Sequence, residues 1–408
     1  MSGVDLGQIM SRQLPAGYLP EVVDGATIMV VGTGALGQNT LQNLALAGVG
    51  RILVVDRDTF STHNLTRSPM AWTIDRDPES VIGKSKVEVV ARAAATIATN
   101  PATRIEWADS WIEDLGFGVF EGVSVIVGAV DSVDARRYLN RASVMLGIPH
   151  VPGGFGGPQV NLGVYPRKSV DEACWVCGGV PDIDPFGCGA RARIIEKAGM
   201  IPSIQPAAAV AGGLQAEAAI GVLHGWESGP RRVFMDIRSV NGAYSVKQPP
   251  SVYCAKRHQK VAEIELAGTG VEGIPAEILE RLGPDEFEVS LNHGYTEISK
   301  CPVCSEAIEV NSPTHNWSRN MCCTECEGGI WPIYDGEKVA GPSTVMVHAD
   351  HPLAGRSFEQ LGYSPGDLVE VRGNGSRGYF RLDGDPTGYF TRARRYGETL
   401  EHEEGEEK

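Results

Sequence analysis

Residues 26–37 read Ala-Thr-Ile-Met-Val-Val-Gly-Thr-Gly-Ala-Leu-Gly, and the fold class follows from this stretch. Its apolar run predicts a buried β-strand that ends at Gly32, and residues 38–46 continue with helical character. Gly32, Gly34 and Gly37 fit the pattern G-x-G-x-x-G, in which glycines let the backbone approach a phosphate at a helix N-terminus. A nicotinamide-dependent dehydrogenase, or a tight turn that binds no nucleotide, would show the same pattern.

Apolar strands alternate with helices on the C-terminal side of this turn. The pattern predicts strands at 51–56, 104–107, 123–130 and 149–152, helices at 84–99, 134–146 and 207–223, and a closing hairpin at 232–237 and 243–247. This alternation predicts an α/β fold with a doubly wound, Rossmann-like, mostly parallel sheet.

Charged and amide side chains follow several of the predicted strands. Asp56 ends the second strand, Asn64, Arg67 and Lys86 follow it, and Asp131 stands at the tip of the strand 123–130. We expect them to converge at the carboxyl edge of the sheet, where α/β folds bind ligands. Two cations can balance a triphosphate and Asp131 can hold Mg²⁺, a set that ATP cleavage needs and hydride transfer does not.

Several further short motifs follow one another along residues 11–217. They are Ser11-Arg12-Gln13, Val31 to Gly37, Leu46-Ala-Gly-Val-Gly50, Asp56-x-Asp58, Asn64-Leu-x-Arg67, Gly83-Lys-x-Lys86, Asn100-Pro101, Asp131 with Arg136 and Asn140, and Gly213-Leu-Gln-Ala-Glu217. With them, residues 8–255 resemble the ubiquitin-activating (E1)-like adenylyltransferases, the family that includes ThiF, MoeB and HesA.

The resemblance implies roles for individual residues. Asp56 would bind ribose, Asp131 would hold magnesium, and Arg12 would reach into the ATP site of a second subunit, which implies a homodimer. The other implied ATP contacts are Gly32, Gly34, Ala35, Leu36, Gly37, Asp58, Asn64, Arg67 and Lys86. The family's usual Arg-Gln is Arg67-Ser68 here and its usual Asp-Asn is Asp131-Ser132, departures that put the partner's identity in doubt.

The implied reaction is attack of a carboxylate on the α-phosphorus of ATP, which forms an acyl adenylate and pyrophosphate. The implied substrate is the C-terminal glycine of a small ubiquitin-like or sulfur-carrier protein. A rival reaction continues to a thioester or acyl persulfide on Cys188, whose neighbours Arg191 and Arg193 favour a thiolate. The sequence also leaves open activation of a peptide for a natural product, an NAD-dependent dehydrogenase, and a zinc-ribbon scaffold without enzymatic activity.

The cysteines predict two zinc sites. Cys174-x-x-Cys177 is half of a zinc site, which the family commonly completes with a second Cys-x-x-Cys after the closing hairpin. This sequence has Cys254-Ala-Lys-Arg-His258 there, so the resemblance implies a Cys₃His site; alternatively this zinc is lost and Cys254 is free. Cys301, Cys304, Cys323 and Cys326 have the spacing of a zinc ribbon, in which Cys322 could replace Cys323.

The sequence divides into an adenylation domain with its zinc-binding loop (1–258), a linker (259–295), a zinc ribbon (296–340), a small β-rich module (341–395) and an acidic disordered tail (396–408). As a hypothesis, the ribbon and the β module recruit the carrier protein or a sulfur donor.

Net charge and the distribution of apolar residues indicate which partners and which cellular compartment to expect. The net charge of −15 argues against nucleic-acid binding, which needs a basic face. Residues 1–12 carry no export signal, so we expect a cytoplasmic protein with reduced thiols. The low-charge run 200–223 contains Pro202, Gln215 and Glu217, so we expect a buried helix there and not a membrane span.

Overall fold

The chain divides into two compact units. The computed structural model describes residues 6–74, 77–178, 202–239, 242–251, 254, 258, 265–266, 268, 270–273, 288–300, 304, 306–313, 315, 344–348, 350–373 and 376–393. Unit 1 comprises 1–110, 122–260 and 390–408, and unit 2 comprises 111–121 and 261–389.

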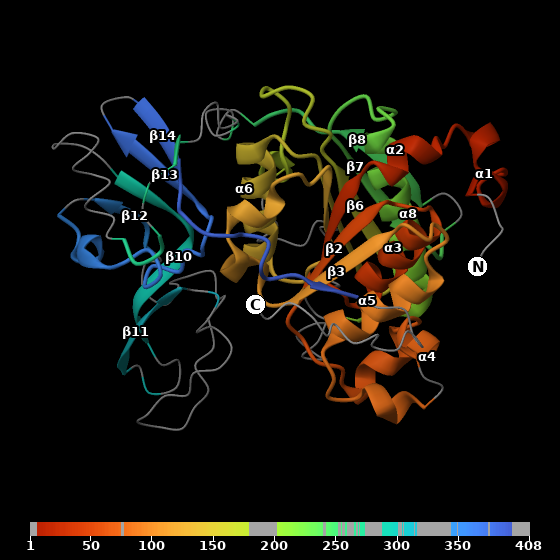
Figure 1. Ribbon diagram of the computed structural model, residues 1–408, viewed down its shortest axis with the longest axis horizontal. Coiled ribbons are helices and arrows are strands. Elements are labelled where there is room, and N and C mark those ends of the chain that lie inside the picture. The colour runs from red at the N-terminus through yellow and green to blue at the C-terminus, as the bar shows by residue number, and fades with distance from the viewer. Residues whose placement is uncertain are drawn as a thin grey trace, which may run out of the picture. The chain divides into compact units, whose positions relative to one another are not determined.

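Unit 1 contains a nine-stranded mixed sheet with the order β15-β3-β2-β1-β4-β5-β6-β7-β8 (Figure 1). The five strands from β3 to β5 run parallel, and the remaining strands pair antiparallel at the two ends of the sheet. The strands are β1 (Thr27–Val31), β2 (Arg51–Asp56), β3 (Arg104–Asp109), β4 (Val125–Gly128), β5 (His150–Gly156), β6 (Gln159–Val164), β7 (Arg231–Asp236), β8 (Ala243–Lys247) and β15 (Thr391–Arg392). The predicted α/β fold and the closing hairpin β7–β8 are confirmed.

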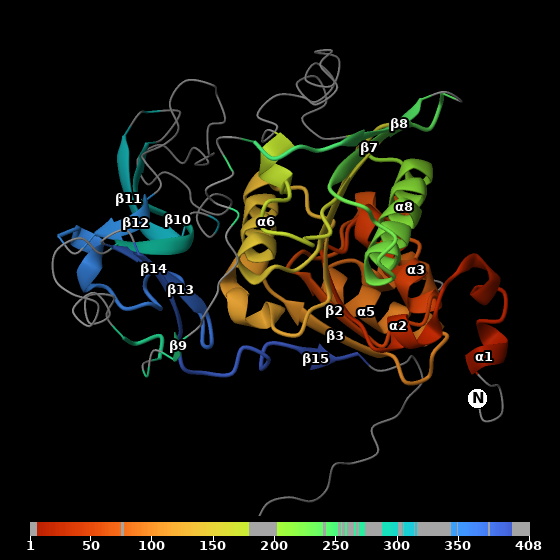
Figure 2. The same cartoon turned by 90° about the horizontal axis from the view of Figure 1, so that it is seen from above.

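Helices cover both faces of this sheet. Figure 2 shows α6 (Val133–Leu146) on one side and α3 (Ala35–Leu46), α5 (Lys86–Ile97) and α8 (Gln205–Leu223) on the other. Shorter helices complete the unit: α1 (Leu6–Ile9), η1 (Leu14–Ala16), α2 (Pro20–Asp24), η2 (Thr62–Arg67), α4 (Ala71–Ile74), η3 (Pro78–Val81) and η6 (Trp175–Gly178).

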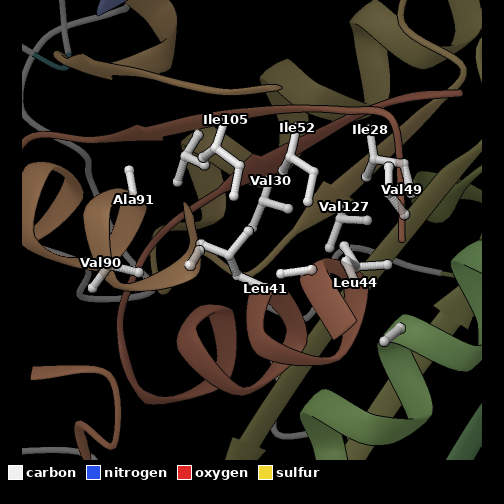
Figure 3. Close-up of a cluster of buried hydrophobic side chains, with 14 of the residues drawn as sticks. Ile28, Val30, Leu41, Leu44, Val49, Ile52, Val90, Ala91, Ile105 and Val127 are labelled. Carbon is white, nitrogen blue, oxygen red and sulfur yellow. The ribbon is translucent and has the colours of Figure 1, made fainter. Parts of the chain in front are cut away.

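The core of unit 1 lies between the sheet and the face that carries α3 (Figure 3). Alternate residues of β1, Ile28 and Val30, point to this side because side chains of a strand alternate between its faces. Leu41 and Leu44 of α3 pack against them, and all four side chains are fully buried. Strands buried on both faces need long apolar runs, which explains the sequence pattern.

α8 is apolar all round because it is a core helix. By length and composition it could cross a membrane, but 56% of its apolar window is buried inside the protein. Ala216, Ala219 and Ile220 join the core around β1, and Ala207 and Ala211 pack with Leu36 and Val160. The predicted buried helix is therefore confirmed.

Unit 2 contains a six-stranded sheet with the order β11-β10-β13-β14-β9, in which β12 also pairs with β10. Its elements are η4 (Ile112–Leu115), η5 (Phe117–Phe120), β9 (Glu265–Leu266), β10 (Glu288–Lys300), β11 (Ala307–Pro313), β12 (Thr344–His348), η8 (Pro352–Gly355), β13 (Leu368–Gly373) and β14 (Ser376–Arg381). Buried side chains such as Leu291, Tyr295, Phe358 and Leu361 form its core.

The structure differs from the predicted division of the C-terminal region. β10 begins in the predicted linker, continues into the predicted ribbon and pairs with β13 of the predicted β module. Residues 111–121, predicted within the adenylation domain, belong to unit 2. Main-chain pairing joins β10 to β13, and side-chain hydrogen bonds such as that of Asp367 with the N–H of Phe117 join 111–121 to unit 2. Neither kind of contact leaves a mark in local composition.

Candidate nucleotide and metal sites

The glycine turn lies where the winding of the parallel sheet reverses. From β1 the chain crosses through α3 to β2 on one side, while β4 pairs with β1 on the other. Ligands of doubly wound sheets bind in the crevice at such a switch point, outside the carboxyl ends of the strands. The turn that follows β1 therefore occupies the expected position.

The three glycines of the turn have different reasons to be glycine. Gly32 has φ +94°, and an added Cβ would lie 2.6 Å from the carbonyl oxygen of Ala129. At Gly37 a Cβ would lie 1.8 Å from the carbonyl oxygen of Gly32. At Gly34 a Cβ would meet nothing within 4 Å. Gly32 and Gly37 thus allow close packing of the turn, whereas Gly34 leaves open space beside it.

The N-terminus of α3 supplies donors for an anion at this turn. The helix begins at Ala35 after Gly34, and the first N–H groups of a helix have no partner within it. The side chain of Leu36 is buried against Val160 and α8. Ala35 and Leu36 can therefore contact a phosphate through their backbone N–H groups.

Asp56 holds the glycine turn as well as facing the site. Its Oδ2 accepts hydrogen bonds from the N–H and hydroxyl of Thr33 (2.6 and 2.8 Å), and its Oδ1 accepts from the N–H of Asp58 (2.8 Å). Burial raises the pKa of the Asp56 carboxyl, and these hydrogen bonds oppose the shift. Oδ2 already accepts two hydrogen bonds, whereas Oδ1 accepts one and retains capacity to accept from a ribose hydroxyl. Sequence reasoning missed the role of Thr33, whose only signal is its place between two glycines.

The loop with Asn64 and Arg67 is ordered by its own side chains. The Asn64 side chain accepts from the N–H of Ser61 (2.9 Å) in a capping box at the start of η2. Arg67 donates to the carbonyl of His63 (2.7 Å). Asn64 is buried, so it shapes the loop, while Arg67 lies at its end.

Lys86 forms an ion pair with Asp58, at 3.0 Å between Nζ and Oδ2. The Lys86 side chain is 12% exposed and that of Asp58 is 51% exposed. An ion pair open to solvent on one side is worth about 0–1 kcal/mol, so a phosphate can displace the carboxylate. The structure therefore places Lys86 at the start of α5, beside the acids that follow β2.

Asp131 is exposed in the turn between β4 and α6. Ser132 caps α6 by accepting from the N–H of Ala135 (3.0 Å), and Arg136 donates to the carbonyl of Val130. The N–H of Ala129 donates to Val31 (2.8 Å), which brings this turn against the glycine turn. Ser132 and Arg136 thus fix the segment that carries Asp131.

Of the other predicted site residues, Arg12 lies in the described part of the chain and Cys188 does not. Arg12 is exposed in the N-terminal segment and shows no resolved contact with the turn after β1. Cys188, with Arg191 and Arg193, lies outside the described residues.

Cys174, Cys177, Cys254 and His258 come together, with their ligand atoms within 4.8 Å of one another. The sulfur of Cys174 lies 3.5 Å from that of Cys254 and 4.0 Å from that of Cys177, and Nε2 of His258 lies 3.2–3.3 Å from the three sulfurs. Tetrahedral zinc, with Zn–S bonds of about 2.3 Å, requires ligand spacings of about this size. The residues therefore fit a zinc ion.

The protonation chemistry of this cluster also suits a cation. Burial, and then the neighbouring sulfurs, raise the pKa of the Cys174 and Cys254 thiols. Burial and then Arg167 lower the pKa of His258, which favours the neutral, ligating imidazole. A bound cation would balance the charge of thiolates this close together, which agrees with the ligand spacings.

Residues from α6 and β7 support the metal cluster. Asn140 donates to the sulfur of Cys174 (3.6 Å) and accepts from the N–H of Trp175 (2.9 Å). Arg232 donates to the carbonyls of Trp175 (2.8 Å) and Gly178 (3.3 Å). The sequence placed Asn140 in the motif with Asp131 and Arg136, as a residue that could tie its helix to the loops, but did not indicate which loop. It gave no signal for Arg232, because both contacts join segments far apart in the chain.

The second cysteine set lies mostly outside the described residues. Cys301, Cys323, Cys326 and the alternative ligand Cys322 are among the residues not described, and Cys304 is exposed. The zinc ribbon therefore stays a prediction.

Comparison with known proteins places these features in context. The sequence profile of the ThiF family matches residues 19–256, more than half of the chain. The adenylyltransferase and sulfurtransferase MOCS3 of Mus musculus is 30% identical over 213 residues, which cover 46% of this chain and 43% of that protein. The adenylyltransferase and sulfurtransferase UBA4 of Yarrowia lipolytica is 27% identical, over 71% of this chain and 74% of that protein. The chain thus spans less than half the length of the mouse relative.

A solved structure shares the fold. The crystal structure of E. coli MccB with MccA-N7isoASN matches with a TM-score of 0.50 at 18% identity, over 63% of this chain and 76% of that chain.

Proposed function

The chain belongs to the ThiF family, and on that basis we propose that it is an ATP-dependent adenylyltransferase acting on the C-terminal carboxylate of a small ubiquitin-like or sulfur-carrier protein. The observation that carries the proposal is the junction of the glycine turn, Asp56 and the Asp131 segment at the reversal of the sheet. Relatives named as adenylyltransferases support it.

In the proposed reaction, a carboxylate oxygen of the carrier forms a bond to the α-phosphorus of ATP. The bond from that phosphorus to the bridging oxygen breaks, and pyrophosphate leaves with the electron pair. A carboxylate is already a competent nucleophile, so the protein need not supply a base. Its contribution is to align the reactants and to stabilise the charge that develops on the phosphates.

The residues at the switch point divide this work. Asp56 accepts a ribose hydroxyl, and the N–H groups that follow Gly34 hold phosphate oxygens. Arg67 and Lys86 stabilise the negative charge of the phosphates, and Lys86 exchanges Asp58 for a phosphate. Asp131 holds Mg²⁺, which neutralises phosphate charge when it is bound.

The Cys₃His cluster holds a structural zinc in this proposal. All four ligands come from the protein, which is the arrangement of a closed site. Through Asn140 the zinc-binding segment is attached to α6, the helix that follows Asp131. The zinc therefore stabilises a helix of the site and takes no part in adenylation.

A homodimer completes the proposed enzyme, with Arg12 of one subunit binding phosphate in the ATP site of the other. Arg12 is exposed, and Leu14 and Leu19, which lie near it in the sequence, are each 44% exposed. A basic side chain beside exposed apolar residues suits a segment that packs on a second subunit.

MgATP binding tests the proposal before the carrier is known. We expect MgATP to raise the melting temperature of the wild type, by mass action, more than ATP with EDTA or NAD does. Asp131→Asn should weaken this shift, and the matched control Asp134→Asn, on the exposed start of α6, should retain it. A shift with NAD alone would indicate a dehydrogenase, and no binding of MgATP would contradict the proposed adenylation.

Exchange of labelled pyrophosphate into ATP then identifies the carboxylate. A carrier protein with a Gly-Gly C-terminus should support exchange, and a short peptide that supports it better would contradict the proposed substrate class. Cys188→Ala, followed through one turnover, separates release of the adenylate from transfer to Cys188, because only transfer requires the thiol.

A further inference from the structure

We propose that Gln38 is a positioning residue of the nucleotide site, which locks the loop that carries Arg67 onto the glycine turn. The inference rests on the proposed function, since it assigns Gln38 a role in binding ATP through other residues. Gln38 lies in the first turn of α3 and is only 1% exposed.

The side-chain amide of Gln38 bridges the two parts of the site. Its Nε2 donates to the carbonyl oxygen of Thr33 (3.0 Å), inside the glycine turn, and to Oγ of Ser68 (3.1 Å), directly after Arg67. Its Oε1 accepts from the N–H of Met70 (3.3 Å). One buried side chain thus holds three points on two segments that are about 30 residues apart.

The contacts require an amide in one orientation. Thr33 O and Ser68 Oγ lie beside Nε2, and a backbone donor, the Met70 N–H, lies beside Oε1. Reversing the amide would set its oxygen against the Thr33 carbonyl and its NH₂ against a donor. A carboxylate of the same length could not donate to the Thr33 carbonyl. An apolar side chain could form none of the three hydrogen bonds. The chemistry of the position therefore fits a linker between loops better than a filler of the core.

The lock reaches the groups expected to contact ATP. Thr33 also donates to Asp56, so the lock connects with the carboxylate that faces the ribose. Ser68 directly follows Arg67, so fixing Ser68 restricts where the guanidinium can lie. Ordering this loop before ATP binds reduces the entropy lost on binding, which is the usual benefit of preorganisation.

Other buried polar residues of α3 serve a different contact. Thr40 donates to Oε1 of Gln215 (2.8 Å), and Asn39 exchanges hydrogen bonds with Gln205. Both partners belong to α8. Thr40→Val is therefore a matched control: it removes a buried hydrogen bond from the same helix and leaves the loop with Arg67 untouched.

The test compares Gln38→Met, Ser68→Ala and Thr40→Val in the full chain. Gln38→Met keeps most of the volume and should raise the Kd for MgATP, by calorimetry, about tenfold, which corresponds to about 1.4 kcal/mol. Ser68→Ala breaks one contact without altering α3, and should raise Kd by about threefold, or about 0.7 kcal/mol. Thr40→Val should remain within about twofold of the wild type even if its melting temperature falls.

Amide hydrogen exchange measures the lock without a nucleotide. The N–H of Met70 should exchange faster in Gln38→Met than in the wild type or Thr40→Val, because it loses its acceptor. Equal Kd values for Gln38→Met and Thr40→Val, or unchanged exchange at Met70, would overturn the inference. If the wild type does not bind MgATP, the proposed function fails, and the role of Gln38 in nucleotide binding fails with it.

Discussion

At the scale of single residues, the same residue type serves different purposes within a few positions. Gly37 is required for packing, because a Cβ there would overlap the Gly32 carbonyl, whereas Gly34 faces open space. Asp56 anchors the turn through Thr33 while it faces the site. A motif therefore combines residues needed for folding with residues needed for binding, and substitutions can separate the two.

Gly34→Ala and Gly37→Ala should fail in different ways. Gly34 has φ −64°, which alanine adopts freely, so Gly34→Ala should keep nearly the wild-type melting temperature and weaken MgATP binding. Gly37→Ala should lower the free energy of unfolding by about 1–3 kcal/mol, as overpacking does. Thermal unfolding and calorimetry measure the two effects, and equal stability losses in both variants would contradict this division.

Asp367 should make the stability of unit 2 depend on pH. Its Oδ1 accepts from the N–H groups of Phe117 (2.6 Å) and Leu368 (2.7 Å) and from Asn292 (3.1 Å), yet burial raises its pKa from 3.8 to about 6. The folded state then binds more protons than the unfolded state between pH 4 and 6. Stability contributed by Asp367 is therefore lost as the pH rises through this range.

Asp367→Asn keeps an acceptor and removes the buried charge. Between pH 4 and pH 7, the free energy of unfolding of the variant should rise relative to that of the wild type by at most about 3 kcal/mol. Unfolding in urea measures this difference. The wild type alone is not enough, because burial lowers the pKa of His293 to about 4 and this group makes stability rise with pH. The difference between variant and wild type isolates the opposite effect of Asp367. A constant difference between the two proteins across this range would contradict the buried charge.

At the scale of elements, α6 connects the two sites. The segment with Asp131 precedes its N-terminus, and Asn140, two turns along, binds the segment with Cys174 and Trp175. β7 holds the same segment through Arg232. Loss of the proposed zinc should therefore loosen an element of the proposed nucleotide site as well as the loop with Cys174 and Cys177.

Removing His258 tests this coupling. His258→Ala should lose about one zinc equivalent and unfold at a lower temperature, whereas His258→Cys should retain zinc as a Cys₄ site. Metal analysis and thermal unfolding measure both results. His348→Ala, at an exposed histidine of unit 2, is the control. Unchanged zinc in His258→Ala would show that this cluster does not hold the metal.

At the scale of the whole molecule, each of the two units is built from separate stretches of the chain. Unit 2 takes residues 111–121 from between β3 and β4, and the chain returns after unit 2 to add β15 to β3. Phe117 and Phe120 are buried, and the N–H of Phe117 binds Asp367. A chain cut near residue 260 would lose both β15 and the partners of 111–121. It would therefore be a poor test of whether the C-terminal region recruits a carrier.

The returning segment should contribute to the stability of unit 1. Ala393 is 8% exposed in the core cluster of unit 1, and its N–H donates to Ile105 (2.8 Å). Ala393→Asp should lower the free energy of unfolding by about 1–3 kcal/mol, because it buries an unpaired charge. Thr391→Asp, at an exposed position of β15, should cost no more than about 0.5 kcal/mol. Equal losses in the free energy of unfolding, measured by denaturant titration, would show that the segment with β15 does not stabilise the β3 edge of the sheet.

Local patterns in the sequence were enough to predict the glycine turn of unit 1, the strands β1 to β5, β7 and β8, and the helices α3, α5, α6 and α8, but they did not predict β6 or β15. These features depend on apolar periodicity and on glycine at defined spacings, which are local properties of a chain. The sequence also indicated the ligand types of the Cys₃His cluster and the acids that end β2 and follow β4. The carboxyl ends of parallel strands share one edge, so these acids could be placed before their contacts were known.

Which distant segments belong together became clear only from the tertiary structure. The lock of Gln38 on Ser68, the support of Cys174 by Asn140, the return of β15 and the place of 111–121 in unit 2 each join residues far apart in the chain. A buried amide or carboxylate must find a hydrogen-bond partner, but its identity depends on the packing of the whole fold. Local sequence patterns therefore predicted most helices and strands of unit 1, whereas burial in the folded protein determined which distant segments contact one another.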